Sequence, residues 1–348
     1  MVVPSPVITP APPAEGPARK HVSVLSLLRG LAALSVGLYH FTGAVLPKIH
    51  IPEVHAFFTN GWLGVEVFFV ISGFIIPYSL LGKDYTVQGF SAYMRKRLIR
   101  INPPAYVAMA LVLAQGYIID YVISHHILYT AGVSMGQILS NMFFIVPFTQ
   151  YKWIVGIFWT LAIEFQFYIF IGLSFNILFE RPNLYAFLLI YLLLGPVQYL
   201  PFQSNEHLFR FSSLFAMGGI TLLYYVGRIS LLKYLLILGL FGAVAYFELS
   251  LYMSLTGLVT SLCISFVKVK NVLFDFLGNI SYSFYLTHAL IGTTCEFFLV
   301  KFINPEPIFN KFLIMTICIT AAVLGAYIFY RIVERRFILL SNLKQVVK

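Results

Sequence analysis

Arg29 and His40 stand eleven positions apart in the otherwise apolar stretch LLRGLAALSVGLYHF at 27–41. In a helix, eleven steps bring the two side chains within about 20° of one face, with His40 about 16 Å deeper than Arg29. An ionisable side chain at that depth in an apolar layer is costly and marks a candidate functional site. The alternative is a histidine that only hydrogen-bonds a neighbouring helix for packing.

Two acidic residues lie in similarly apolar stretches. Glu66 precedes Ser72 and Gly73 in NGWLGVEVFFVISGF, where the glycine permits the close approach of a neighbouring backbone. Glu164 lies four residues before Tyr168, so the two side chains share a helix face. The Glu66 carboxyl group is predicted to line a polar cavity or, alternatively, to be a protonated and hydrogen-bonded structural group, and Glu164 is one further carboxylate in the bilayer that requires an explanation.

A second histidine closes the stretch GNISYSFYLTH at 278–288. Ser281, Tyr285 and His288 follow one another at i, i+4 and i+7 and form a polar stripe, which Tyr282 flanks. Histidine is suited to general base catalysis near neutral pH, with a carboxylate to orient it. The stripe therefore adds to the candidate site.

Arg97 and Arg100 lie in the most basic segment of the chain, three positions apart and hence on one helix face. Arginines at a membrane surface are expected for orientation alone. Their guanidinium forks also suit a phosphate group. The break predicted at Asn102-Pro103-Pro104 would hold the pair at a helix entry.

The composition places these residues in a membrane protein. The chain has 348 residues, of which 59% are hydrophobic and only 10% charged, which excludes an ordinary soluble domain. Repeated apolar runs predict an all-α polytopic protein with about ten transmembrane helices. The predicted spans are 24–46, 59–81, 101–120, 157–179, 184–200, 209–226, 234–250, 251–267, 273–299 and 308–330.

The distribution of basic residues predicts the orientation. With the N-terminus in the cytoplasm, most of the 23 Lys and Arg residues fall on the inner side, so both termini are expected to be cytoplasmic. The net charge of +10 follows from this bias and does not indicate a nucleic-acid partner. Residues 1–20 are predicted to be a disordered Pro-rich tail, 21–340 the membrane domain, and 341–348 a cytoplasmic tail.

The remaining polar residues carry weaker signals. Cys263, Cys295 and Cys318 have no metal-binding spacing, and no metal site is expected. The segment 121–156 is predicted to form a short helix at the outer leaflet that could cover a cavity. His50, His55, His125 and His126 are expected to face solvent. Glu206, His207 and Arg210 are expected to be solvated on the outer side or, alternatively, to touch an acceptor.

Membrane histidines, membrane carboxylates and a basic entrance suggest a site that is open to both sides. A phosphate-bearing substrate would dock at Arg97 and Arg100 from the cytoplasm, and a hydroxyl-bearing substrate would arrive from outside. This suits group transfer across the bilayer, but spacing alone does not separate it from proton-coupled transport.

The motifs together resemble the acyltransferase-3 family of integral membrane acyltransferases, which includes bacterial surface-glycan O-acetylases. The resemblance rests on the spacing of Arg29 and His40 and on four further motifs in family order: GWLGVEVFFVISGF at 61–74, RKRLIR at 95–100, FWTLAIEFQFY at 158–168 and GNISYSFYLTH at 278–288. It implies transfer of an acyl group, usually acetyl from acetyl-CoA, to a hydroxyl of an extracytoplasmic carbohydrate at the cell surface. It also implies location in a bacterial inner membrane.

The resemblance assigns roles to individual residues. It implies that His40 is the catalytic histidine with Arg29 as its partner, that Arg97 and Arg100 contact the phosphates of acyl-CoA, and that Glu164 and His288 belong to the site. Two readings from other classes remain: a proton-coupled transporter of a polar solute or acylated carrier, and a scaffold whose polar residues only fix helix register. The supporting site residues are Glu66, Ser72, Tyr168, Ser281, Tyr282 and Tyr285.

Overall fold

The computed structural model describes residues 22–43, 52–123, 125, 129–201 and 205–343, and within these ranges it contains helices and no strand. The predicted tail at 1–20, His50, His126 and residues 344–348 lie outside this part. The α-helices are α1 (Val24–Gly43), α2 (Pro52–Thr59), α3 (Gly64–Tyr78), α4 (Phe90–Ile118), α5 (Met135–Met142), α6 (Phe158–Phe175), α7 (Leu184–Leu194), α8 (Ser212–Tyr225), α9 (Leu231–Glu248), α10 (Leu251–Phe266), α11 (Val272–His288), α12 (Thr294–Leu299), α13 (Ile308–Phe329) and α14 (Arg335–Leu343).

The spans predicted from hydropathy correspond to helices of the structure. In the described residues, seven helical segments are long and apolar enough to cross a membrane, and two shorter apolar helices, α7 and α10, accompany them. The remaining predicted span, 273–299, consists of α11 and α12 joined by the π-helical turn Ala289–Thr293. Its polar stripe lowers its hydropathy, so it is absent from the seven. The all-α, polytopic class is confirmed.

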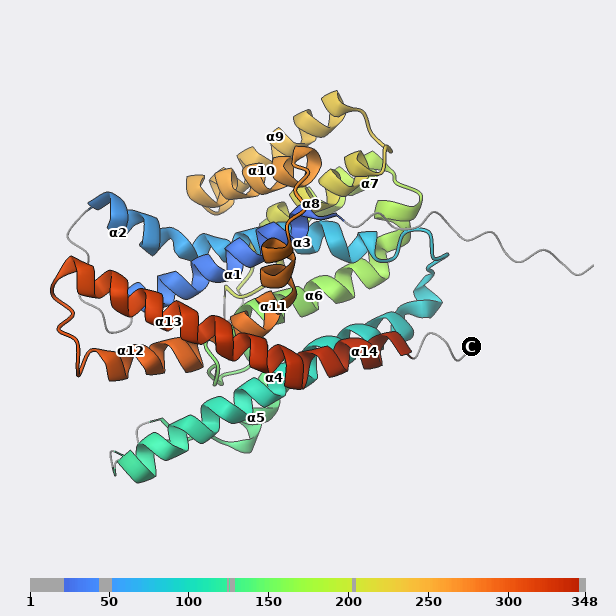
Figure 1. The fold of residues 1–348 in the computed structure, drawn as a ribbon. Coiled ribbons are helices and arrows are strands. Elements are labelled where there is room, and N and C mark those ends of the chain that lie inside the picture. Colours follow the sequence, from blue (N-terminus) through green and yellow to red (C-terminus); the bar gives the residue numbers. More distant parts are fainter. Residues whose placement is uncertain (1–21, 44–51, 124, 126–128, 202–204, 344–348) are drawn as a thin grey trace, which may run out of the picture.

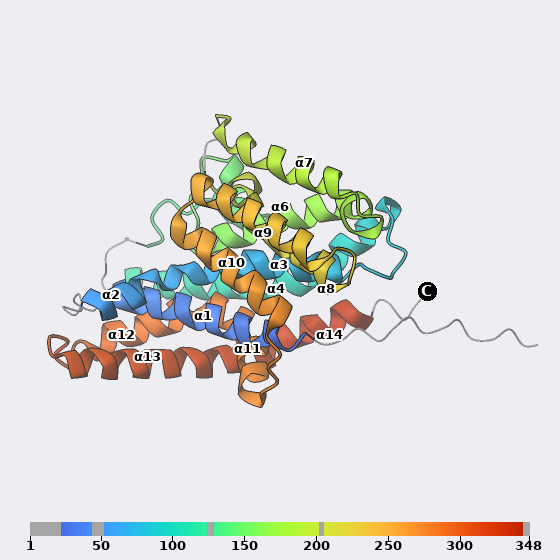
Figure 2. The same cartoon turned by 90° about the horizontal axis from the view of Figure 1, so that it is seen from above.

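The helices run along a common axis, with α1 near the middle of the bundle (Figure 1). α1 packs mainly against α11 and α3, α3 packs against α8, and α11 packs against α13. The view from above places α9 and α10 on one side of α1 and α13 on the other (Figure 2). Of the other elements that carry predicted site residues, α6 packs against α3, and α4 runs along the lower side of the bundle in Figure 1 and packs against α6 and α11.

Two glycines bring α3 and α8 into close contact. A Cβ atom on Gly73 would meet the carbonyl of Phe215, and one on Gly218 would meet the carbonyl of Val70. The close approach predicted at Gly73 is therefore present, and it lets the Phe215 ring stack on the ring of Phe167 with centroids 4.1 Å apart.

The predicted break after Arg100 is wrong. Helix α4 runs without interruption through Pro103 and Pro104. The two prolines remove two backbone donors, yet the helix continues: Ala105 is fully buried in the core, and the Tyr282 hydroxyl donates to the carbonyl of Ile101 at 2.8 Å. Arg97 and Arg100 thus lie within one long helix.

The segment 121–156 contains the predicted short helix. This is α5, which begins after Ser134, whose hydroxyl accepts a hydrogen bond from the backbone N–H of Gln137 at 3.2 Å. The serine thus satisfies one of the free donors of the first turn.

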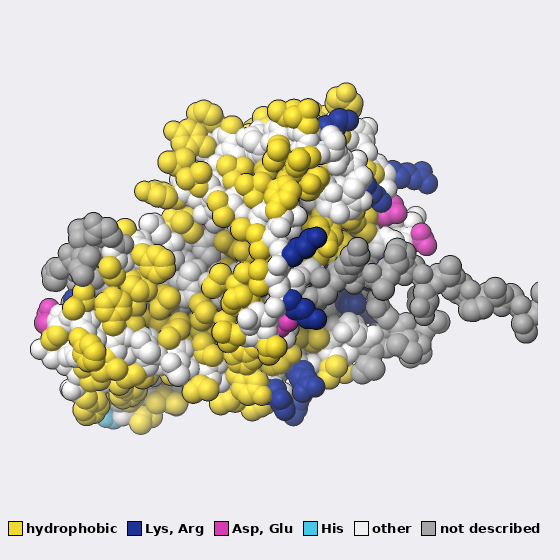
Figure 3. Space-filling view, turned by 45° about the horizontal axis from the view of Figure 1, so that its top comes forward, with side chains coloured by type: hydrophobic (Ala, Val, Ile, Leu, Met, Phe, Trp, Pro, Cys, Tyr) yellow, Lys and Arg dark blue, Asp and Glu magenta, His cyan; other side chains and the backbone are white. Residues whose placement is uncertain are grey.

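Basic side chains gather at one end of the bundle. In the space-filling view, Lys and Arg lie mainly toward the end that holds α14, while apolar side chains cover much of the remaining face (Figure 3). We call this the basic end; here α3 finishes, α4 begins and α14 lies. Its charge agrees with the predicted cytoplasmic side, and the orientation itself stays a prediction.

Candidate functional site

An interior cavity of about 480 Å³ lies between α1, α3, α4, α6 and α11. Apolar side chains such as Val65, Phe68 and Ile71 form part of its wall. Nine of the site residues predicted from the sequence also line this cavity, and they come from all five of these helices. They are Arg29, Ser72, Arg97, Arg100, Glu164, Tyr168, Ser281, Tyr282 and Tyr285.

Glu164 is the acidic centre of this cavity. Its Oε1 atom accepts hydrogen bonds from the hydroxyl of Tyr168 at 2.5 Å and from the hydroxyl of Ser72 at 3.2 Å. The i, i+4 spacing of Glu164 and Tyr168 thus forms a real contact, and α3 supplies the third group. Two donors hold the carboxylate in one orientation toward the cavity.

Arg97 is held rigidly at the cavity wall. Its Nη2 donates to the hydroxyl of Ser79 at 2.5 Å. Its guanidinium carbon lies 5.7 Å from the ring centroid of Tyr93 and 5.4 Å from that of Tyr168. Stacking between two aromatic rings fixes the plane of the fork, so Arg97 is preorganised for a planar anionic group.

Glu334 belongs to the same cavity and was missed in the sequence. It is 2% exposed and accepts hydrogen bonds from the backbone N–H of Ser283 at 3.2 Å and from its hydroxyl at 2.5 Å. It also interacts electrostatically with Arg29 and Arg100. The sequence signal for Glu334 was a single carboxylate within the basic run RIVERRF. Its role became visible only in the structure, where the last span returns to the basic end.

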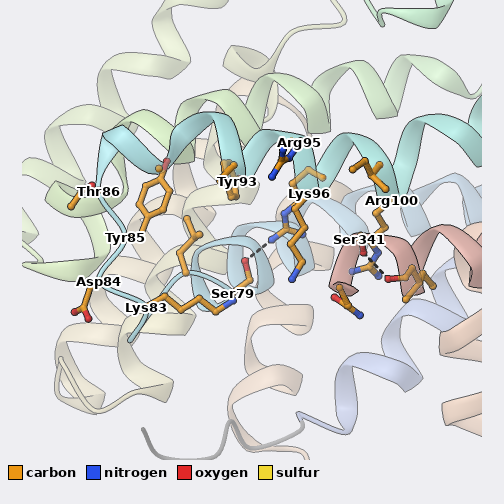
Figure 4. A pocket seen from close by; sticks show the side chains of 17 residues that line it. Ser79, Lys83, Asp84, Tyr85, Thr86, Tyr93, Arg95, Lys96, Arg100 and Ser341 are labelled. Carbon is orange, nitrogen blue, oxygen red and sulfur yellow. Dashed lines mark hydrogen bonds between the residues drawn. The ribbon is translucent and has the colours of Figure 1, made fainter. Parts of the chain in front are cut away.

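A second cavity, of about 460 Å³, opens at the basic end (Figure 4). Its wall combines Lys83, Arg95 and Lys96 with the aromatic rings of Tyr85 and Tyr93. The Tyr85 hydroxyl donates to the carbonyl of Gly172 at 2.7 Å, and burial raises the pKa of this phenol. This cavity is therefore basic and aromatic at once.

Arg97 and Arg100 line both cavities. In Figure 4, Arg100 and Arg95 project from α4, and Ser341 comes from α14 opposite Arg100. The pair therefore stands where the basic cavity adjoins the interior one. A ligand with phosphates in the first and an extended arm in the second would pass these two guanidinium groups.

The two membrane histidines meet. His288 Nε2 lies 3.3 Å from His40 Nδ1, and the ring centroids are 5.0 Å apart. His288 is fully buried, whereas His40 is half-buried. Neither is among the residues that line the interior cavity, so the pair forms a separate unit toward the end of α1 opposite the basic end.

Backbone carbonyls define how the histidine nitrogens are used. Nδ1 of His288 lies 2.8 Å from the carbonyl of Tyr285, and Nδ1 of His40 lies 2.8 Å from that of Val36. Both Nδ1 atoms donate in this arrangement, because a carbonyl only accepts. The single Nδ1–H of His40 is then shared between the Val36 carbonyl and Nε2 of His288, and Nε2 of His40 keeps a lone pair, as a general base requires.

Tyr285 connects the histidine pair to the interior cavity. Its side chain lines the cavity, while its carbonyl binds His288. Its hydroxyl lies 2.7 Å from the hydroxyl of Thr160 and donates to the carbonyl of Ile157 at 3.2 Å. The cavity therefore ends beside the histidines, and Thr160 is a further polar group there that sequence reasoning did not identify.

The remaining predicted residue, Glu66, lies elsewhere. It is 1% exposed and lines a third cavity, away from the basic end, together with Glu206 and Arg210. The expectation that the loop of Glu206 and Arg210 is solvated is wrong for His207, whereas Glu206 is half-buried. His207 is 2% exposed against the ring of Phe148, and Glu206 accepts a hydrogen bond from the indole of Trp153 at 2.7 Å. Aromatic packing draws this loop onto the protein.

No group of three or more His, Cys, Asp or Glu side chains that could hold a metal ion occurs in the part of the chain that the structure describes. The three cysteines in this part are free thiols, and Cys318 is buried among apolar residues of α13 and its neighbours.

Comparison with known proteins gives one family. A family model described as an acyltransferase domain matches residues 23–331. A Staphylococcus aureus protein named "Putative O-acetyltransferase" is 31% identical over 161 residues, 43% of this chain and 24% of its own. A Bacillus subtilis protein named "Putative peptidoglycan O-acetyltransferase" is 28% identical over 191 residues, 51% of this chain and 28% of its own.

A protein of Acidianus two-tailed virus, named "Putative acetyltransferase", is 32% identical over 151 residues, which are 43% of this chain and 39% of the viral one. The chain thus covers less than half the length of each of these three relatives. No solved structure matches it.

Proposed function

This chain belongs to the acyltransferase-3 family, whose model covers residues 23–331, and from that premise we propose that it is a membrane O-acyltransferase. It moves an acyl group, most simply acetyl, from cytoplasmic acyl-CoA to a hydroxyl of an extracytoplasmic carbohydrate or glycolipid. The names of the relatives, all acetyltransferases, support this reaction type.

The observation that carries the proposal is the position of Arg97 and Arg100 on both the basic and the interior cavity. Acyl-CoA joins a phosphate-rich nucleotide to a long, weakly polar pantetheine arm. The basic cavity offers arginine forks, lysines and tyrosine rings to the nucleotide. The interior cavity offers an apolar channel with a few polar groups to the arm.

At the far end of the interior cavity the thioester would lie beside Tyr285 and Thr160. The acceptor hydroxyl gives its proton to Nε2 of His40, and its oxygen attacks the thioester carbonyl carbon. A C–O bond forms, the C–S bond breaks, and CoA leaves as a thiolate that takes up the proton from His40. The hydroxyl of Tyr285 stabilises the developing oxyanion.

His288 acts through His40 in this scheme. Its Nε2 shares the Nδ1–H of His40 with the carbonyl of Val36, and the two acceptors together favour the tautomer in which the catalytic Nε2 is unprotonated. A route through an acyl-histidine intermediate would use the same nitrogen as nucleophile. Labelled acyl retained on His40 in the absence of acceptor would select that second route.

The test is release of free CoA from acetyl-CoA by the purified protein in lipid nanodiscs with a surface-glycan extract. Wild type is expected to release CoA and to acetylate the extract. Transport of a solute across proteoliposomes without any CoA release would contradict the proposal and favour a transporter.

A further inference from the structure

The third cavity, of about 440 Å³, lies away from the basic end and is unlike the other two. It combines aromatic rings with carboxylates, an amide and one guanidinium group. Building on the proposed acyl transfer, we propose that it binds a pyranose ring of the glycan acceptor. Its wall is formed by Trp62, Val65, Glu66, Trp159, Asn205, Glu206, Arg210, Phe211 and Met253.

The two tryptophans supply an apolar platform. A pyranose presents C–H groups on its faces and hydroxyls at its edge, so it packs on an indole ring while its edge forms hydrogen bonds. Trp159 is held by ring contacts with Phe69 and Phe211, with centroids 6.3 and 6.0 Å apart. Trp62 and Trp159 are both half-buried, which leaves part of each ring for a ligand.

Glu66 gives the platform an unsatisfied acceptor. It is 1% exposed, and its Oε2 atom has no hydrogen-bond partner among the residues that the structure describes. A buried carboxyl oxygen without a partner is costly. A hydroxyl of a bound sugar would satisfy it.

Glu206 adds a second, oriented carboxylate. The indole N–H of Trp153 donates to its Oε2 at 2.7 Å, and the backbone N–H of Leu208, two residues further along the chain, donates to the side chain of Gln166 at 3.0 Å. These bonds hold the 205–208 segment against α6. The cavity thus offers planar polar groups that form hydrogen bonds with sugar hydroxyls: two carboxylates, an amide and a guanidinium group.

The cavity is placed to deliver an acceptor to the donor. Val65 lines both this cavity and the interior one, so the two adjoin across α3. Trp159 immediately precedes Thr160, whose hydroxyl contacts that of Tyr285. Anchoring at the membrane interface would account for the tryptophans, but not for an unpaired buried carboxyl oxygen between them.

Tryptophan fluorescence tests the proposal directly. The chain has three tryptophans, and all lie at this cavity: Trp62 and Trp159 line it, and Trp153 binds its Glu206. We would titrate the protein in nanodiscs, without acyl-CoA, with chitotetraose and cellotetraose as glycan probes and with pentaerythritol as a non-sugar polyol. A saturable change with a glycan probe and none with the polyol is expected.

Glu66→Gln keeps every tryptophan and the side-chain shape, and it should weaken glycan binding at least tenfold. The control is Phe302→Ala, which removes an 84% exposed ring from the turn between α12 and α13 and should change binding less than twofold. In the transfer assay, Glu66→Gln should raise KM for the glycan at least tenfold and KM for acetyl-CoA less than twofold. Trp62→Ala is a second variant, at a half-buried position, and it should likewise raise KM for the glycan but not KM for acetyl-CoA.

Two failures are distinguishable. Wild type that turns over acetyl-CoA with a glycan, yet shows no fluorescence change and no effect of Glu66→Gln on the glycan KM, overturns the proposed sugar site and leaves the transferase. Saturable glycan binding without any CoA release keeps the sugar site and rejects the acyl transfer.

Discussion

Arg97→Lys separates recognition of the nucleotide end of acyl-CoA from general effects of charge. Lysine keeps the positive charge but loses the planar fork that donates to Ser79 and lies between the rings of Tyr93 and Tyr168. A hydrogen bond to a charged group contributes about 1.5–3 kcal/mol. At about 1.4 kcal/mol per factor of ten, KM for acetyl-CoA should rise about 10- to 100-fold.

The matched control is Arg181→Lys. Arg181 is exposed and lines none of the three cavities described above, so the same substitution there should change KM for acetyl-CoA less than about threefold. The assay follows CoA release against donor concentration at saturating acceptor, with the melting temperature of each variant measured alongside.

A truncated donor gives the refuting result. S-acetylpantetheine keeps the arm and the thioester but lacks the nucleotide, and Arg97→Lys should not alter its KM. An equal rise for both donors would show that Arg97 shapes the interior cavity rather than binding phosphates, and would refute the reasoning.

Two further predictions concern stability. Gly73→Ala should lower the free energy of unfolding by about 1–3 kcal/mol, because the new Cβ meets the carbonyl of Phe215; Gly239→Ala, with open space around it in α9, should raise it by up to about 1 kcal/mol. Equal shifts of the two melting temperatures would contradict the account of α3–α8 packing. Glu334→Ala should cost about 3 kcal/mol, because it strips the acceptor from Ser283 and the carboxylate that faces two arginines; thermal melts that match wild type would contradict this.

Hydropathy was sufficient for the transmembrane helices because each must satisfy its own backbone inside the bilayer. It said less about how they end. Pro103 and Pro104 predicted a break, yet packing of α4 keeps the helix continuous through them. Local propensity was overridden by contacts that no single segment contains.

Nine residues singled out in the sequence line one cavity, but the division of the candidate residues into separate units could not be predicted. Arg29 and His40 share a helix in the sequence, whereas in the structure Arg29 lines the interior cavity and His40 pairs with His288. Glu66 and Glu164 looked equivalent as membrane carboxylates, yet they line different cavities. Only the packing of α1 between α3 and α11 decides which polar groups meet.

Glu334 and the 205–208 segment were missed for a related reason. In the sequence, both a carboxylate within a basic run and a polar loop are typical of solvent-exposed surface. Each is buried or bonded because distant elements, α11 for Glu334 and the 153–166 region for the loop, bring donors to it.

The central claim is that His40 moves the proton of an acceptor hydroxyl during acyl transfer. The most direct measurement is acetyl-CoA turnover with a glycan acceptor by wild type and by His40→Ala, with protein level, melting temperature and acetyl-CoA binding measured in both. A positioned general base contributes about 10²- to 10⁴-fold, so the folded variant should lose that factor in rate while it binds acetyl-CoA as before. A folded variant that turns over at the wild-type rate would contradict the claim.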